Sequence, residues 1–116
     1  MGLDIYLSMN KIQMQQLGYW RDFKPLHNWF VVNVQNNVDD CNRYKVTRKQ
    51  LKQLLNICKQ VYDNPTLANT LLPDNKPLNT VTEYDDYLSK LNKTIVIIST
   101  ILDNNKNKVF YYLGSW

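Results

Sequence analysis

The two ends of the chain carry the pattern that most constrains its fold. Residues 3–9, LDIYLSM, alternate between apolar and more polar side chains with a period of two. Such alternation is typical of a β-strand with one buried face. Residues 108–114, KVFYYLG, repeat the pattern and place Val109, Tyr111 and Leu113 on one face. We therefore predict that the two terminal strands pair in one sheet, against which the elements between them pack.

The segment from Thr47 to Tyr62 has the clearest helical pattern of the chain. It starts with TRKQ, a capping box in which Thr47 is the N-cap and Gln50 reaches back to it. Apolar side chains then follow with helical spacing at Leu51, Leu54, Leu55, Cys58, Val61 and Tyr62. The basic residues of the segment cover the opposite face: Lys49, Lys52 and Lys59. This pattern predicts an amphipathic helix.

A helix is also expected after Asp22. This residue suits the N-cap, and Pro25 falls in the first turn, where its missing N–H costs little. The apolar stripe of this helix is formed by Phe23, Leu26, His27, Trp29, Phe30 and Val34. We expect the helix to end near residues 35–37.

The segment after Thr82 leaves two alternatives open. Thr82 suits an N-cap, and no helix breaker interrupts the chain from Glu83 to Thr100. The apolar stripe of that helix contains Tyr84, Tyr87, Leu88, Leu91, Ile95, Ile98 and Leu102. Residues 94–100, TIVIIST, are rich in β-branched side chains and also suit a strand in a loose hairpin with VFYYL. We favour one long helix that ends near Leu102.

Shorter elements complete the pattern. Residues 43–46, RYKV, suit a short strand, and residues 64–73 suit a short helix begun by Pro65. Lys11–Gly18 has the composition of a polar connection. The sum is an α+β fold, in which the N- and C-terminal strands form a small antiparallel sheet with about three helices packed on one face. A chain of 116 residues predicts a single domain over residues 1–116.

Composition restricts the classes of function. Fourteen Lys and Arg residues against ten Asp and Glu residues give a net charge of +4, which suits an anionic partner. The basic residues are spread from Lys11 to Lys108, and this dispersion does not favour nucleic-acid binding. Cys41 and Cys58 lack the spacing of a metal site or a disulfide framework. The chain shows no signal-peptide pattern, and its longest apolar run is about half of the ~20 residues that span a membrane. We therefore expect a cytoplasmic protein without membrane contact, metal or cofactor.

Residues 18–30, GYWRDFKPLHNWF, look most like a binding site. They contain five aromatic residues, two basic residues and the only histidine of the chain. If the helix after Asp22 extends back by one turn, Trp20, Lys24 and His27 share a face with Arg21 beside them. An aromatic ring and cationic donors suit a phosphate- or nucleobase-bearing ligand. The alternative is that the aromatic residues form core and that both basic residues are solvated.

Residues 38–41, VDDC, allow three interpretations. Asp39 and Asp40 could hold a divalent cation, or Cys41 could act as a nucleophile with His27 as its base. Adjacent aspartates in a turn are far more often part of the turn itself, and we favour that interpretation.

Two further motifs lie near the C-terminal half of the chain. In TEYDDY, residues 82–87, acidic residues favour the start of a helix, and Tyr84 and Asp85 are candidates for ligand contact. At the end of the chain, Trp116 either fixes the tail to the domain, which we favour, or completes an aromatic pocket.

Several strings of the chain, taken in order, resemble a family of small uncharacterised proteins encoded by bacteriophages and prophages. These strings are MGLDIYL, GYWRDFKPLHNWF, VDDC, LLP, TEYDDY and GSW. The family has a Gly/Phe-rich loop before its TEYD string, where this chain has KPLNTV. The residues that the resemblance singles out are Tyr19, Trp20, Arg21, His27, Trp29, Asp39, Asp40, Tyr84 and Asp85.

The resemblance implies an accessory phage protein that acts in the bacterial host cytoplasm, against host defence. Our first hypothesis is a module that binds a small anionic, nucleotide-like ligand where the first helix meets the start of the last one. Its ligand-binding residues would be Tyr19, Trp20, Arg21, Lys24, His27, Asp40, Tyr84 and Asp85. The second hypothesis is an inhibitor of a host defence protein or nuclease that uses the same aromatic residues and forms homo-oligomers. The third is a small hydrolase of a phosphoester or nucleoside, with His27 as general base helped by Asp39 or Asp40.

Overall fold

A computed structural model describes residues 2–9, 16–104 and 108–116. The predicted connection over Lys11–Gly18 therefore lies largely outside the described residues. The elements, in chain order, are β1 (Asp4–Ser8), β2 (Gln16–Arg21), α1 (Lys24–Asn33), β3 (Tyr44–Val46), α2 (Arg48–Asp63), the 3-10 turn η1 (Pro65–Leu67), α3 (Ala68–Leu71), α4 (Val81–Asn104) and β4 (Phe110–Ser115).

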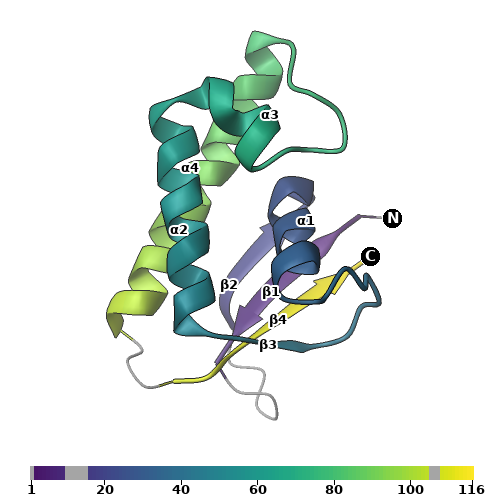
Figure 1. The fold of residues 1–116 in the computed structure, drawn as a ribbon, viewed down its shortest axis with the longest axis vertical. Helices are drawn as coiled ribbons and strands as arrows, with labels where there is room; N and C mark the ends of the chain where they lie inside the picture. Colours follow the sequence, from purple (N-terminus) through teal and green to yellow (C-terminus); the bar gives the residue numbers. More distant parts are fainter. Residues whose placement is uncertain (1, 10–15, 105–107) are drawn as a thin grey trace.

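The four strands form one antiparallel sheet in the order β2-β1-β4-β3. The two terminal strands lie in its centre, and β1 pairs with β4 from Asp4↔Ser115 to Ser8↔Tyr111. The helices lie on one face of the sheet, and the two ends of the chain lie close together beside α1 (Figure 1). The predicted α+β fold, the pairing of the terminal strands and the short strand β3 are confirmed.

Strand β2 was not predicted, and the proposed backward extension of the first helix is wrong. Gln16–Arg21 pairs with β1 along its length. Asp22 then adopts a positive φ of 55°, which breaks the chain direction between strand and helix. The carboxylate of Asp22 accepts the backbone N–H of Leu3 at 2.7 Å instead of capping α1, whose N-cap position is Phe23. The helix starts after Asp22 because the Asp22 carboxylate is already bound to the backbone N–H of Leu3, at the start of β1.

The three predicted apolar stripes form the core. In α1 the buried residues include Leu26, His27 and Phe30, and the predicted C-terminus was two to four residues too far along. Helix α2 has the predicted capping box between Thr47 and Gln50. Its buried residues are Leu51, Leu54, Cys58 and Val61, whereas Tyr62 is exposed.

Helix α4 is continuous over the segment for which a strand was the alternative. Its cap is Thr80, not Thr82: the Thr80 hydroxyl accepts the Glu83 N–H at 3.1 Å, and the Glu83 carboxylate accepts the Thr80 N–H at 2.9 Å. The backbone N–H groups of Asn79 and Thr80, which both donate to the Glu83 carboxylate, hold the pKa of Glu83 below its usual range. The sequence placed the cap two residues too late because Thr82 offers the same hydroxyl.

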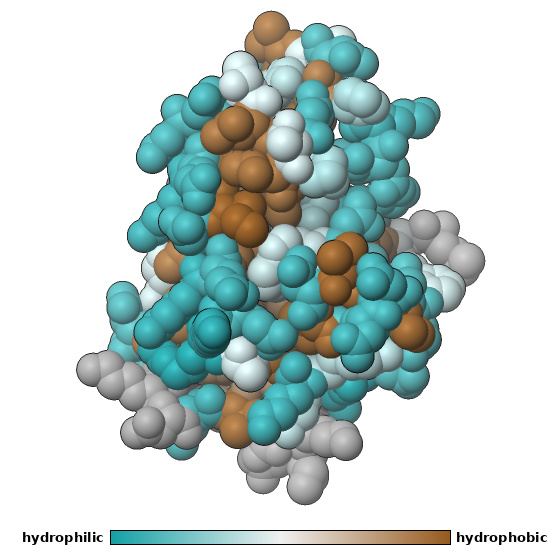
Figure 2. Space-filling model, viewed as in Figure 1, coloured by the Kyte–Doolittle hydropathy of each residue, from teal (hydrophilic) through white to brown (hydrophobic). Residues whose placement is uncertain are grey.

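The helical face of the molecule carries an apolar depression. Figure 2 shows apolar side chains gathered between α2 and α1. A hollow of about 180 Å³ lies in this area, and its lining includes Trp29, Val32, Leu71, Leu72 and Pro73. Among the described helices, none is long and apolar enough to cross a membrane.

Candidate functional site

A chain of hydrogen bonds links four residues from distant parts of the sequence. Nδ1 of His27 lies 2.5 Å from the Tyr112 hydroxyl, and its Nε2 lies 2.8 Å from Oδ1 of Asp39. The indole N–H of Trp116 donates to the same Asp39 oxygen at 2.8 Å. We call Tyr112, His27, Asp39 and Trp116 the His27 network. It runs from the buried face of the sheet to the end of the chain.

The partners of His27 define its tautomer. A carboxylate oxygen can only accept, so Nε2 carries the proton that binds Asp39. Nδ1 then accepts the hydroxyl proton of Tyr112. Both ring nitrogens are therefore hydrogen-bonded, which explains how a histidine with only 5% of its surface exposed is tolerated in the core.

Two features of β4 hold the imidazole in place. Tyr112 is fully buried, and its ring stacks on Phe30 with 3.9 Å between centroids. Burial raises the pKa of the Tyr112 hydroxyl, so it remains a hydrogen-bond donor. A Cβ on Gly114 would lie 2.5 Å from Nδ1 of His27, so the ring packs directly on the glycine backbone. Position 114 must lack a side chain for His27 to occupy this place.

The His27 network borders a small hollow, which we call the His27 hollow. Its volume is about 150 Å³, and it is lined by Leu3, Lys24, His27, Asn28, Asp39, Asn75 and Trp116. The amide of Asn28 donates to the side chain of Asn75 at 3.2 Å. Trp116 is 55% exposed. Its indole N–H is bound to Asp39, so the exposed part of the side chain is the ring. The hollow thus combines an aromatic ring, one cation, two amides and the Asp39 carboxylate, which is bound to His27 and Trp116.

The structure brings together only part of the predicted site. Lys24 and His27 both line the His27 hollow. Trp20 is core: it is 1% exposed, and its indole N–H donates to Thr94 at 2.9 Å. The prediction that Trp20 forms an aromatic wall for a ligand is wrong, because the strand conformation of β2 turns its side chain under α4.

Tyr19 and Arg21 alternate with Trp20 along β2 and lie on the opposite face of the sheet. The Tyr19 hydroxyl donates to Asp4 at 2.5 Å, and Arg21 forms an ion pair with the same oxygen at 3.0 Å. These bonds hold the pKa of Asp4 below its usual value, mainly through the Tyr19 hydroxyl. Neither residue can therefore share a pocket with His27.

Asp40 organises its own loop. Its carboxylate accepts the Tyr44 hydroxyl at 2.7 Å and the Asn42 side-chain amide at 3.0 Å. The Tyr44 bond is the main reason that the pKa of Asp40 is lowered. Cys41 follows with a positive φ of 56°. The favoured interpretation of VDDC as a turn agrees with this geometry, while its first aspartate joins the His27 network.

The predicted meeting point of α1 and α4 is concave but acidic. A hollow of about 150 Å³ lies there, and its charged lining consists of Asp22, Asp74, Glu83, Asp86 and Lys90. Four carboxylates against one ammonium group would repel an anionic ligand. Neither Tyr84 nor Asp85 is part of this lining, and neither lines the His27 hollow. The location proposed for the anionic ligand is therefore unsuitable.

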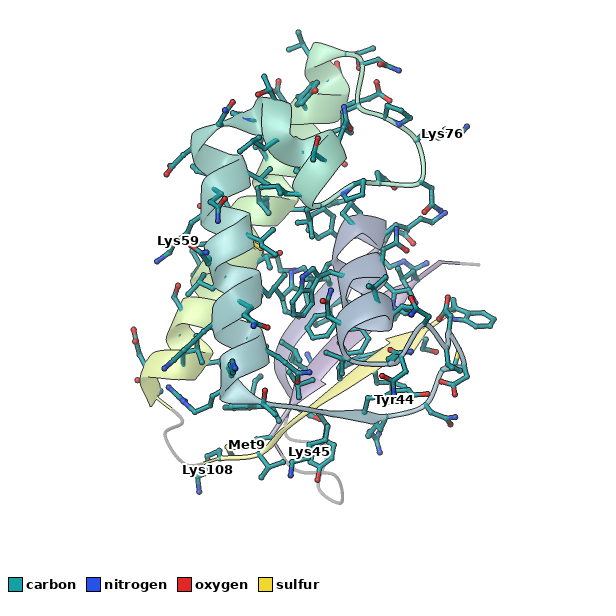
Figure 3. The ribbon with its side chains drawn as sticks, in the orientation of Figure 1. Met9, Tyr44, Lys45, Lys59, Lys76 and Lys108 are labelled. Atoms are coloured by element: carbon teal, nitrogen blue, oxygen red, sulfur yellow. The ribbon has the colours of Figure 1, made fainter. Side chains whose placement is uncertain are left out.

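A larger groove lies between α2 and α4. Its volume is about 510 Å³, and its lining includes Arg48, Lys52, Leu55, Lys59 and Leu102. Lys59 projects from α2 on the side opposite α1 (Figure 3). Arg48 is already bound to the Leu102 carbonyl at 2.7 Å. The residues that line this groove include cations but no aromatic ring. They also form no hydrogen-bonded network like that of His27.

Sequence reasoning missed Tyr112, Asn28 and Asn75 as neighbours of His27. Tyr112 is separated from His27 by 85 positions, and no local pattern links the two. Trp116 was considered both as a fixing point for the tail and as part of an aromatic pocket, and its position serves both. Across the residues that the structure describes, no group of three or more His, Cys, Asp or Glu side chains could hold a metal ion.

Comparison with protein-family models, with curated protein sequences and with solved structures gives no significant match.

Proposed function

We propose that this protein is a binding module that holds a small anionic, nucleotide-like ligand at the His27 hollow. The observation that supports it is the His27 network, which fixes polar groups at the edge of a hollow that also presents Lys24 and the exposed ring of Trp116. The resemblance to phage proteins supports an accessory role against host defence, in the cytoplasm of the bacterial host.

Each group of the hollow has a chemical task in this proposal. The ring of Trp116 stacks on a nucleobase, and Lys24 neutralises a phosphate. Lys24 is also the first residue of α1, where the helix dipole favours negative charge. Asn28 and Asn75 offer amide donors and acceptors that can recognise the edge of a base.

The size of the hollow limits how the ligand is held. Pockets that enclose drug-sized ligands have volumes of about 300–1,000 Å³. At about 150 Å³, the His27 hollow accommodates one group of a nucleotide, and the remainder lies against Trp116 on the surface. We therefore expect ligands with exposed bases to bind through stacking and charge together.

The hydrolase hypothesis has less support. A general base needs a free nitrogen within reach of its substrate. Both ring nitrogens of His27 are already bound, one to a hydroxyl and one to a carboxylate, and the ring is buried. The same bonds leave no nitrogen to activate Cys41.

The test is a thermal-shift and titration series with nucleotides and cyclic nucleotides, after mass spectrometry of small molecules released from natively purified protein. We expect one nucleotide class to raise the melting temperature by several degrees and to quench the fluorescence of Trp116. Lys24→Ala should weaken binding, and the matched control Lys49→Ala, at an exposed position of α2, should not. If Lys52→Ala weakens binding while Lys24→Ala does not, the ligand occupies the α2–α4 groove and the proposal fails. The absence of any shift or released ligand would also contradict it.

A further inference from the structure

The face of the sheet that points away from the helices carries an ordered set of aromatic and charged side chains. Strand alternation and register place them in rows across the strands. Tyr19 and Tyr6 are directly opposite each other on β2 and β1. Tyr111 on β4 lies opposite Lys45 on β3. No helix of the described chain covers this face, since the buried partners of α4 and α1 lie on the other side.

These tyrosines are unusual for a sheet face in contact with water. Such a face is normally polar. Here Tyr6, Tyr19 and Tyr111 are each half-buried, so part of each side chain is open to solvent. The rings of Tyr6 and Tyr19 are 5.3 Å apart, and the Asp4 bond holds the Tyr19 hydroxyl. The result is a sheet face with three half-exposed tyrosine rings, two of which are in contact with their planes tilted by 46°.

Each part of this surface has a cation beside it. Lys93 extends from α4 and lies 5.9 Å from the centre of the Tyr19 ring. Lys45 is exposed beside Tyr111, and Figure 3 places it at the same end of the sheet as Lys108. Arg21 lies at the other end, and it compensates the charge of Asp4. The fold thus gathers on one face basic residues that are dispersed in the sequence.

We propose that this face binds single-stranded nucleic acid, with Tyr6, Tyr19 and Tyr111 stacking on bases and Lys45 and Lys93 contacting the phosphate backbone. Proteins that bind single strands combine stacking aromatic residues with cations along the backbone. An open four-stranded sheet with aromatic side chains serves this purpose in RNA-recognition domains. Diagonal neighbours across two strands, such as Tyr6 and Tyr111, are about 7–8 Å apart, which suits two spread bases.

This site is separate from the proposed function at the His27 hollow. Successive residues of β4 point to opposite faces, so Tyr111 belongs to the outer face and Tyr112 to the His27 network. Binding at one face can therefore be tested without disturbing the other. Nucleic-acid binding was not expected from the sequence because the basic residues are dispersed along the chain. The sheet and α4 bring some of them to one face.

The experiment is fluorescence anisotropy with labelled oligo-dT and oligo-U of about 12 nucleotides at low and moderate salt. We expect binding to both single strands, weaker binding to duplex, and an affinity that falls with salt. Tyr6→Leu and Tyr111→Leu should each weaken binding by about tenfold or more, because leucine keeps apolar cover but cannot stack.

Lys45→Gln tests the charge contribution in a residue that is exposed and does not support the fold. It should lower the slope of log K against log salt by about 0.7, the effect of one phosphate contact on a single strand. The matched control Lys76→Gln, in the loop before α4, should leave the slope unchanged, and so should Lys24→Ala at the His27 hollow. The proposal is overturned if the wild type binds no single strand at low salt. It is equally overturned if both leucine variants melt normally and bind as well as the wild type; the face would then fit a protein partner.

Discussion

Tyr111 and Tyr112 are neighbours in β4, yet they belong to different environments. Tyr112 is fully buried, stacks on Phe30 and donates to His27. Tyr111 lies half-buried on the outer face, opposite Lys45 and Ser8. The difference follows from the two-residue period of a strand, which turns successive side chains to opposite faces. Identical residues therefore acquire opposite roles: one stabilises the core and the other forms surface.

The two faces also treat charge differently. On the inner face, burial keeps the Tyr112 hydroxyl protonated, and both ring nitrogens of His27 are hydrogen-bonded. On the outer face, the carboxylate of Asp4 stays ionised beside Arg21 and Tyr19. A solvent-exposed face can retain charge because water screens it, whereas the inner network must satisfy every donor and acceptor.

The largest expected effect separates the two tyrosines directly. Tyr112→Ala should destabilise the protein by about 3–5 kcal/mol, since it removes a packed core ring and leaves a cavity. Tyr111→Ala should lower the free energy of unfolding by less than about 1 kcal/mol, because the Tyr111 ring is partly solvated. Urea unfolding followed by circular dichroism measures both. Similar losses for the two variants would contradict the assignment of the faces.

Alkaline pH should lower the free energy of unfolding, mainly through groups buried on the inner side. Burial raises the pKa of the Cys58 thiol to about 12 and raises the pKa values of Tyr87 and Tyr112 as well. Above their ordinary pKa values these groups lose protons in the unfolded chain but keep them in the folded one, so stability falls as pH rises. We expect a loss of roughly 2–3 kcal/mol between pH 8 and pH 10, mostly from Cys58.

Cys58→Ala provides the control for that prediction. The variant is less stable at every pH because it loses packing, but its stability should decline less steeply above pH 8.5 than that of the wild type. Urea midpoints at several pH values give the two slopes. A wild-type slope that remains flat to pH 10 would show that these groups do not stay protonated.

Gly114→Ala tests the contact that positions His27. The added Cβ would overlap the imidazole, and overpacking of this kind costs typically 1–3 kcal/mol. The same substitution in a His27→Ala background should cost less, because the ring that it displaces is absent. A double-mutant cycle with urea unfolding measures the coupling. Additive losses would mean that Gly114 is required for another reason.

The fold was largely predictable because its main signals are local. Alternation over residues 3–9, the capping box at Thr47 and the stripe of α4 each lie within one element. Strand β2 was missed because both of its faces carry aromatic residues, Tyr19 and Trp20, so a period of two is not visible. Its conformation depends on pairing with β1, which is a non-local property.

The site was less predictable for the same reason. Two of the predicted ligand-binding residues, His27 and Lys24, line the same hollow because they lie on one short segment. Their other partners come from the loop at Asp39, from β4 and from the chain end, 77 positions beyond Asp39 in the case of Trp116. Only the register of the sheet and the course of the loops bring these residues together.

The smallest expected effect concerns the exposed end of the His27 network. Trp116→Phe removes the N–H that binds Asp39 but keeps an aromatic ring, so it should cost no more than about 1 kcal/mol. All three tryptophans are described, and Trp20 and Trp29 are buried while Trp116 is 55% exposed. Quenching of fluorescence by acrylamide should therefore be strong in the wild type and weak in the variant. A variant that keeps strong quenching would show that Trp20 or Trp29 is accessible to acrylamide. The core around His27 would then not be closely packed. Weak quenching together with a small stability loss would place Trp116 where a ligand can reach its ring without unfolding the core.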